Sequence, residues 1–187
     1  MALHLSEADW TQIFPRAPAA VIAAFVGQVA ALDAAGITNT RTRLAYALAN
    51  VEHECDGYTI KNLTENINYT AKRMAEIWPK RFKSAADVQA KYGTANGWQR
   101  KAFDDIYGKR MGNRPGTNDG SSYIGRGGPQ ITGRDGYAQV GARCGLDLVG
   151  DPDLATRPEH QPALLAAFWS GKKLNDFADA GDFRGCV

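Results

Sequence analysis

Cysteine, histidine and excess charge of either sign are all scarce in this sequence of 187 residues. The three cysteines (Cys55, Cys144 and Cys186) are an odd number without CxxC spacing, so neither a disulfide framework nor a zinc knuckle is predicted. A net charge of +2 does not indicate nucleic acid as a partner, and it favours an anionic surface only weakly.

Long apolar runs are also missing. The longest covers residues 17–32, is interrupted by Gln28 and is too short to span a bilayer. Glu7, Asp9 and Trp10 occupy the place of the basic region of a signal peptide. We therefore expect a protein made in the cytoplasm without a signal peptide and without stable insertion into a membrane. The length suits one domain over residues 1–187, and no separate binding domain is visible.

Repeated helix start and stop signals predict a mainly α-helical fold. The segment from Ser6 to Asp9 resembles a capping box before Pro15, Pro18 lies near a second start, and Gly36 is placed to end that helix. The second helix would bury an apolar stripe of Val21, Ile22, Phe25, Val26 and Val29. Further helices are expected from about residue 40 to 56 and over 84–92, 98–106, 135–145 and 158–171. Strand-like alternation is limited to residues 122–124 and 130–132, which could pair as short strands.

Two glutamates, Glu54 and Glu65, are candidates for paired acid–base chemistry. Glu54 lies in the polar last turn of a predicted helix, and Glu65 follows in a polar segment typical of a loop. Cleavage of a glycosidic bond needs one carboxylic acid to protonate the leaving oxygen and one carboxylate to act as base or nucleophile. From residue type alone, both could equally be ordinary surface glutamates.

Metal chemistry is not predicted. His53-Glu54 begins like the zinc-binding pattern HExxH, but the fifth residue is Gly57 rather than histidine. His53 by itself is more typical of a hydrogen-bonded structural residue than of a metal ligand. No cofactor is expected.

The segment 108–133 holds 8 of the 20 glycines in 26 residues, which is typical of a functional loop. It is not a phosphate loop, because it lacks the GK[ST] ending and Pro129 removes a backbone donor. It could instead form a cleft wall where Gln130 and Thr132 offer hydrogen bonds, or a structural turn cluster. Arg126 could fix a carboxylate or an N-acetyl carbonyl, or make an internal salt bridge. Aromatic side chains that could stack on a sugar, or simply lie in the core, are Tyr58, Tyr69, Trp78, Tyr123 and Tyr137.

Six blocks in consistent order over roughly residues 20–184 resemble the phage and bacterial endolysin branch of glycoside hydrolase family 19, the family 19 chitinases. The most specific is Tyr123-Ile-Gly-Arg-Gly-Gly-Pro-Gln-Ile-Thr-Gly-Arg-Asp-Gly-Tyr137. The other five are residues 47–57, 65–70, 78–82, 107–113 and 166–179.

The resemblance implies a lysozyme-like, bilobed helical domain with a substrate cleft and an inverting mechanism. In that mechanism Glu54 would be the general acid and Glu65 the general base, while Thr132 would help to place the attacking water. The residues expected to bind the substrate are His53, Asn68, Tyr69, Tyr123, Arg126, Gln130 and Tyr137. The implied partner is a polysaccharide, bacterial peptidoglycan or a chitin-like polymer, cut by a monomeric enzyme that reaches the cell wall on host lysis.

The sequence departs from the family pattern at three places. Gly136 stands where the family usually has asparagine, and Gly128 stands where a bulkier residue is common. The sequence also ends at Gly185-Cys-Val187, before the segment and final helix with which the family normally continues. Two alternatives to an endolysin therefore stay open: a chitinase with the same chemistry, and a catalytically impaired protein that only binds the wall.

Overall fold

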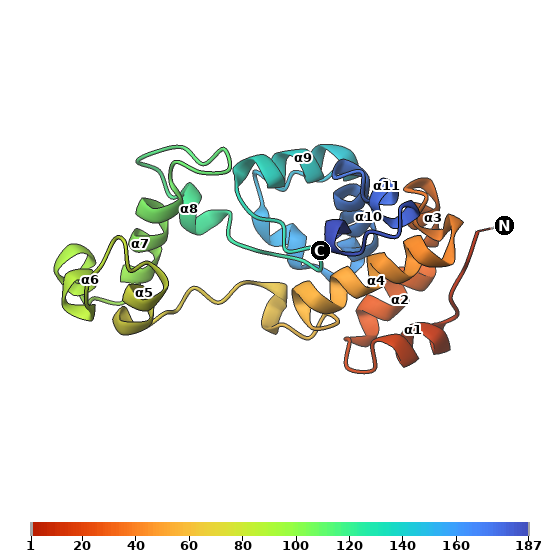
Figure 1. The fold of residues 1–187 in the computed structure, drawn as a ribbon, viewed down its shortest axis with the longest axis horizontal. Coiled ribbons are helices and arrows are strands. Elements are labelled where there is room, and N and C mark those ends of the chain that lie inside the picture. The colour runs from red at the N-terminus through yellow and green to blue at the C-terminus, as the bar shows by residue number, and fades with distance from the viewer. Residues whose placement is uncertain (1, 187) are drawn as a thin grey trace.

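The computed structural model describes residues 2–186, which form short helices joined by loops (Figure 1). The α-helices are α1 (Glu7–Ile13), α2 (Ala19–Gly27), α3 (Val29–Ala34), α4 (Arg41–Cys55), α5 (Ala71–Ile77), α6 (Ala85–Tyr92), α7 (Trp98–Tyr107), α8 (Asp119–Ser122), α9 (Arg134–Cys144), α10 (Gln161–Gly171) and α11 (Leu174–Asp179). Single 3-10 turns are η1 (Ile37–Asn39), η2 (Lys61–Leu63), η3 (Pro152–Thr156), η4 (Pro158–His160) and η5 (Arg184–Cys186). The prediction of a mainly α fold is confirmed. Within residues 2–186, no helix combines the length and the apolar character needed to cross a bilayer.

Several of these helices begin at a side-chain cap, at the positions where the sequence predicts a helix start. Ser6 and Asp9 form a complete capping box on α1, and Ser84 and Asp87 form another on α6. Thr40 caps α4 by accepting a hydrogen bond from the backbone N–H of Arg43. These bonds satisfy N–H groups that have no partner inside the helix, and so they fix where each helix begins.

The single helix predicted over residues 18–36 is in fact two helices. Gln28 has non-helical dihedral angles (φ −123°, ψ 30°) and separates α2 from α3. Its side-chain amide donates to the carbonyl oxygen of Glu159 at 2.8 Å, which ties the break to η4. Val26, in the last turn of α2, is 39% exposed, so its predicted place in the buried stripe is wrong.

The two short strands predicted over 122–124 and 130–132 are absent from the described residues. Ser122 ends α8 instead, and only the isolated bridges Thr64–Arg126 and Arg126–Ile131 form. Gly127 and Gln130 have positive φ values of 74° and 49°, which turn the chain sharply between the paired residues. The turn is too tight for a strand ladder to extend from it.

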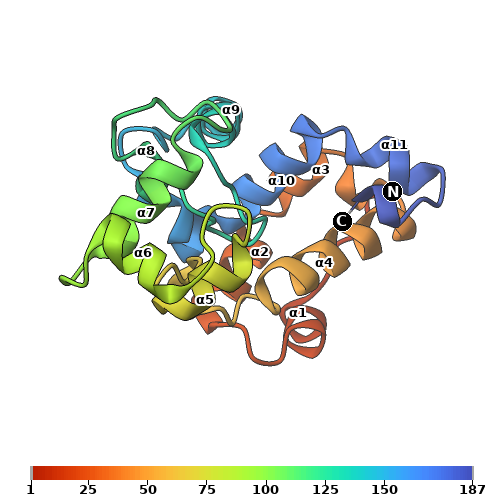
Figure 2. The same ribbon diagram turned by 60° about the vertical axis from the view of Figure 1, so that its left-hand side comes forward.

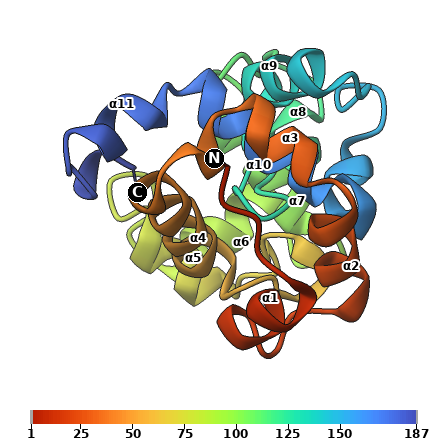
Figure 3. The same cartoon turned by 90° about the vertical axis from the view of Figure 1, so that its right-hand side faces the viewer.

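The helices pack into two lobes (Figures 1 and 2). The small lobe contains α5, α6 and α7 around its own core, which includes Met74, Val88 and Phe103. The large lobe has two cores, one built mainly by α1, α2, α4 and α11 and one built mainly by α9 and the loops beside it. Helix α10 belongs to both: Leu165 and Trp169 face the first core, and Leu164 and Ala167 face the second. It packs against α2, α3, α9 and α11 (Figure 3).

The chain crosses between the lobes twice. The first crossing is the extended segment after Leu63, which reaches the small-lobe core at Ile67. The second is the glycine-rich segment, where Tyr123 faces the core of α9 and the next residue, Ile124, faces the core of the small lobe. The two crossings are hydrogen-bonded to each other, and the candidate site lies where they meet.

Two glycines of α9 provide a test of this packing. A Cβ on Gly136 would make only an ordinary contact, 3.8 Å from Ile131, whereas a Cβ on Gly141 would lie 2.5 Å from the carbonyl oxygen of Leu146. Gly136→Ala should stabilise the protein by about 0.5 kcal/mol, because alanine loses less backbone entropy in a helix. Gly141→Ala should destabilise it by about 1–3 kcal/mol through overpacking. Urea unfolding of both variants checks this, and equal effects would contradict the packing described here.

Candidate active site

Glu54 lies in the last turn of α4. Its neighbours Val51 and Cys55 are fully buried, which leaves the side chain of Glu54 half-buried at the edge of the core and that of His53 exposed. The chain turns away immediately afterwards, because Asp56, Gly57 and Tyr58 all have positive φ. The carboxyl group of Glu54 is therefore presented at the end of a rigid 15-residue helix.

Glu65 lies on the first crossing and is fixed to the second by two hydrogen bonds. Its backbone N–H donates to the carbonyl oxygen of Gly125 at 2.8 Å, and the N–H of Gly125 donates to its Oε2 at 3.1 Å. A Cβ on Gly125 would lie 2.5 Å from Oε1 of Gln130, so a larger residue there would displace the Gln130 side chain. The glycine thus allows the backbone to approach and orient the Glu65 carboxylate.

Glu65 and Thr132 line the same cavity, which has a volume of about 240 Å³ and lies between α7 and the glycine-rich segment. The Thr132 hydroxyl donates to the carbonyl oxygen of Gln130 at 2.9 Å, which fixes its position on the wall. Tyr107 and Tyr123 line this cavity as well. The structure therefore brings together two of the three predicted catalytic residues, while Glu54 is not part of this lining.

The charge of Glu65 is felt by three tyrosines around it. Burial, followed by the negative charge of Glu65, raises the pKa of Tyr69 and of Tyr107 above the usual value of 10. Burial raises the pKa of Tyr137 to about 12, with a smaller contribution from Glu65. These hydroxyls stay protonated at neutral pH, so they add no negative charge near Glu65.

Arg126 and Tyr137, both predicted to bind the substrate, take part in a network of internal hydrogen bonds. Tyr137 is fully buried and donates to the carbonyl oxygen of Ile124 at 2.6 Å. Arg126 Nη1 donates to the carbonyl oxygen of Ser122 at 2.6 Å and to the Tyr137 hydroxyl at 3.0 Å, and its Nε lies 3.1 Å from Asp153. Both side chains thus stabilise the conformation of the glycine-rich segment.

The other predicted binding residues differ in how open they are. Tyr123 is only 6% exposed and donates to the carbonyl oxygen of Val149, but it borders the cavity of Glu65. Tyr69 is half-buried against Trp78 and Phe103. Asn68 is exposed, and its backbone N–H donates to the side chain of Asn66. Among the candidates for sugar stacking, Tyr58 is buried in the core.

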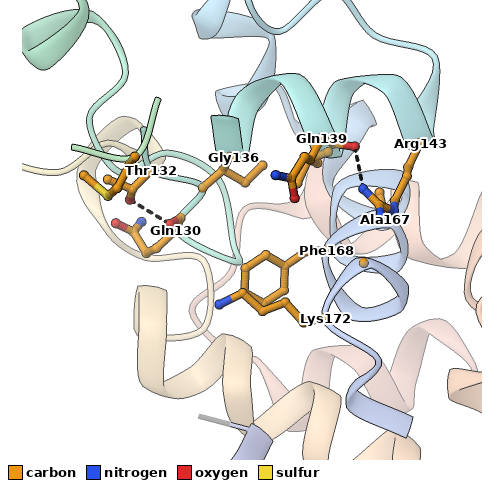
Figure 4. Close-up of a pocket in the computed structure, with 12 residues that line it drawn as sticks. Gln130, Thr132, Gly136, Gln139, Arg143, Ala167, Phe168 and Lys172 are labelled. Carbon is orange, nitrogen blue, oxygen red and sulfur yellow. Dashed lines mark hydrogen bonds between the residues drawn. The ribbon is translucent and has the colours of Figure 1, made fainter. Parts of the chain in front are cut away.

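A second pocket, which was not predicted from the sequence, has a volume of about 340 Å³ (Figure 4). Met111 and Thr132 line both pockets, so the two adjoin. Gln130 borders the second pocket at the same end, and α9 and α10 form its walls. Met111 lies in the block of residues 107–113 and has a positive φ of 52°, but its residue type and spacing predicted no role for it.

Tyr58 accounts for the glycine at position 128. A Cβ on Gly128 would lie 2.5 Å from Cε1 and 2.9 Å from the hydroxyl oxygen of Tyr58. The ring of Tyr58 therefore occupies the space that a larger residue at 128 would need. This departure from the family pattern is compensated inside the core.

A buried carboxylate, Asp119, holds the loop that carries Asn113 at the cavity of Glu65. Arg114 donates two side-chain hydrogen bonds to Asp119, of 2.9 and 3.0 Å. These bonds lower the pKa of the Asp119 carboxyl group to about 2, although burial acts to raise it. Asn113 in turn accepts a hydrogen bond from the backbone N–H of Arg134 at 2.9 Å. The loop is thus anchored by charge on one side and by α9 on the other.

This anchor predicts a loss of stability in acid. The pKa of Asp119 is lowered from about 3.9 in the unfolded chain, so its contribution is complete above pH 4 and disappears as the pH falls towards 2. We expect it to contribute about 2 kcal/mol, because the side chain is only 2% exposed. Urea unfolding between pH 6 and pH 2.5 should show that Asp119→Asn is less stable at pH 6 and has a flatter pH dependence. Parallel curves for the two proteins would contradict this.

The fold and the site together define a two-lobed helical protein with a fixed carboxylate and a hydroxyl in a cavity at the crossing between the lobes. No family model matches the chain. The chain is 31% identical over 166 residues to a glycosyl hydrolase family 19 domain-containing protein of Haemophilus influenzae, and the match covers 84% of this chain and 76% of the relative. The protein belongs to glycosyl hydrolase family 19, and its class is that of a glycoside hydrolase acting on a polysaccharide.

Proposed function

We propose that the protein is an endolysin-type enzyme that hydrolyses β-1,4 linkages in the glycan strands of bacterial peptidoglycan. The observation that carries the proposal is the convergence of Glu65 and Thr132 on one cavity, with the Glu65 carboxylate oriented by Gly125. Family membership adds the reaction class. Such an enzyme acts as a monomer, needs no cofactor and reaches the wall when the host cell lyses.

The proposed reaction is a single displacement with inversion. Glu65, as carboxylate, accepts a proton from a water molecule that the Thr132 hydroxyl helps to hold, and the water oxygen bonds to the anomeric carbon. Glu54, as carboxylic acid, gives its proton to the glycosidic oxygen while the carbon–oxygen bond breaks. Inversion requires the two carboxyl groups to lie about 6.5–9.5 Å apart in the complex with substrate, which leaves room for the water.

Solvent exposure separates the residues that could touch the sugar from those that position other groups. His53 and Asn68 are exposed, and Tyr69, Gln130 and Thr132 are partly exposed, so these side chains are the ones available to touch the sugar. Arg126 and Tyr137 are positioning residues in this scheme, because their polar groups bond to the loop itself. Tyr123 lines the cavity, and its hydroxyl donates to the carbonyl oxygen of Val149.

Mass spectrometry of digested sacculi tests the proposal most directly. A muramidase leaves a new reducing end on N-acetylmuramic acid, whereas the opposite specificity leaves it on N-acetylglucosamine. NMR of the fresh product should show the inverted anomer. Retention at the anomeric carbon, or the absence of any new reducing end, would refute the proposal.

Two other functions are also compatible with part of this site. A chitinase would cleave soluble N-acetylglucosamine oligomers and leave sacculi intact. A wall-binding protein without activity is favoured by Gly136, which places no amide side chain in the second pocket. It would sediment with sacculi without releasing reducing sugars.

A further inference from the structure

The second pocket carries an unusual charge distribution for a site that binds a sugar polymer. Arg143 from α9 and Lys172, the residue that follows α10, both line it, and no acidic residue does. Neither cation takes part in any of the ion pairs formed among residues 2–186. The pocket therefore offers two positive charges that the described part of the chain does not neutralise.

Both charged groups are held against the walls of the pocket. Arg143 Nη1 donates to the carbonyl oxygen of Gln139 at 3.0 Å, and its guanidinium lies against α10 at Gly171, where a Cβ would come within 3.2 Å of Nε. Lys172 Nζ lies 4.6 Å from the centre of the Phe168 ring, a cation–π contact. Holding the side chains in this way lowers the entropy lost when a ligand binds.

The pocket adjoins the cavity of Glu65, because Met111 and Thr132 line both. A glycan strand placed against Glu65 and Thr132 would therefore bring its substituents to Arg143 and Lys172. A polymer of N-acetylglucosamine has no charged substituent to offer there. Peptidoglycan has one, because its lactyl-linked peptides carry free carboxylates.

We propose that this pocket binds a carboxylate of the peptide attached to the glycan, with Arg143 and Lys172 as its cationic partners and Phe168 as an apolar surface for the peptide. The inference rests on the proposed function and goes further, since it makes peptide-bearing strands the preferred substrate. Arginine presents paired N–H donors that suit a carboxylate, and charge-assisted bonds of this type are the stronger hydrogen bonds. The preference should weaken as salt increases, because the pocket is open to solvent.

Binding is tested first, in a Glu54→Gln background so that the ligand is not consumed. The probes are purified glycan strands with their peptides and the same strands with the peptide carboxylates converted to amides, titrated calorimetrically. We expect the strands with free carboxylates to bind about tenfold more tightly, which corresponds to about 1.4 kcal/mol. Adding Arg143→Gln and Lys172→Gln should reduce this ratio to about one. The control adds Lys80→Gln and Lys101→Gln, exposed lysines of the small lobe that lower the net charge equally and should keep the ratio.

The outcomes separate this inference from the proposed function. Equal binding of the two strands to the Glu54→Gln protein, or an unchanged ratio in the pocket variant, would overturn the inference. Failure of the wild-type protein to cleave sacculi, together with a preference for strands with free peptide carboxylates that depends on Arg143 and Lys172, would refute only the proposed hydrolysis. Loss of the ratio in the small-lobe control as well would show a general charge effect and would also overturn the inference.

Discussion

Glu54→Gln should lose hydrolytic activity by about 10²- to 10⁴-fold, the range that general acid–base catalysis contributes. The amide has nearly the same shape as the carboxyl group, but it cannot give a proton to the leaving oxygen. Because Glu54 is only half-buried, the free energy of unfolding should change by less than about 0.5 kcal/mol. Turbidity of outer-membrane-permeabilised cells and release of reducing sugars measure the loss.

Glu52→Gln is the matched control for Glu54, since Glu52 lies on the same helix two residues earlier and is exposed. It should retain wild-type activity. A substrate with a good leaving group, such as a nitrophenyl glycoside, needs less proton donation and should restore part of the rate of Glu54→Gln. Equal lysis by the wild type and Glu54→Gln would remove Glu54 from the mechanism.

Glu65→Gln should lose activity by a similar factor, about 10²- to 10⁴-fold, because an amide does not accept the proton of the attacking water. Its oxygen can still accept the hydrogen bond from Gly125, so the protein should keep its stability. Glu65→Ala leaves that N–H without its partner and should also lower the free energy of unfolding by about 1 kcal/mol. Urea unfolding and sacculus digestion of both variants separate the two effects.

Azide provides the sharper test of Glu65. In Glu65→Ala the removed side chain leaves room for a small anion, which is already deprotonated and can replace the activated water. Added azide should therefore raise the rate of Glu65→Ala and give a glycosyl azide of inverted configuration. A rise in rate with retained configuration would assign Glu65 a different role, and wild-type activity in Glu65→Gln would exclude it as the base.

Local rules predicted much of the helical fold correctly. Capping residues such as Ser6, Thr40 and Ser84 act through bonds to backbone groups three residues away, so their effect is visible in a short stretch of sequence. Thr70 caps α5 in the same way, which means that this helix, not predicted above, carried a usable signal. The break at Gln28 was different, because its amide bonds to Glu159, 131 residues away.

The candidate site shows the same contrast between features that the local sequence predicts and features that depend on distant contacts. Glu65 and Thr132 were selected by residue type and by resemblance, and the structure places them on one cavity. The internal role of Arg126 depends in part on Asp153, which no spacing rule connects to it. The second pocket forms only when α9 and α10 pack together, so Arg143 and Lys172 gave no sign of being neighbours in the sequence.

The two glutamates belong to different parts of the fold, and this has a consequence for engineering. Glu54 is carried by α4 in the large lobe, whereas Glu65 is carried by a crossing segment that is latched to Gly125. No single rigid element sets the gap between them. Substitutions along the crossings, at positions that do not touch the substrate, should therefore widen or narrow that gap and change the turnover without replacing either glutamate.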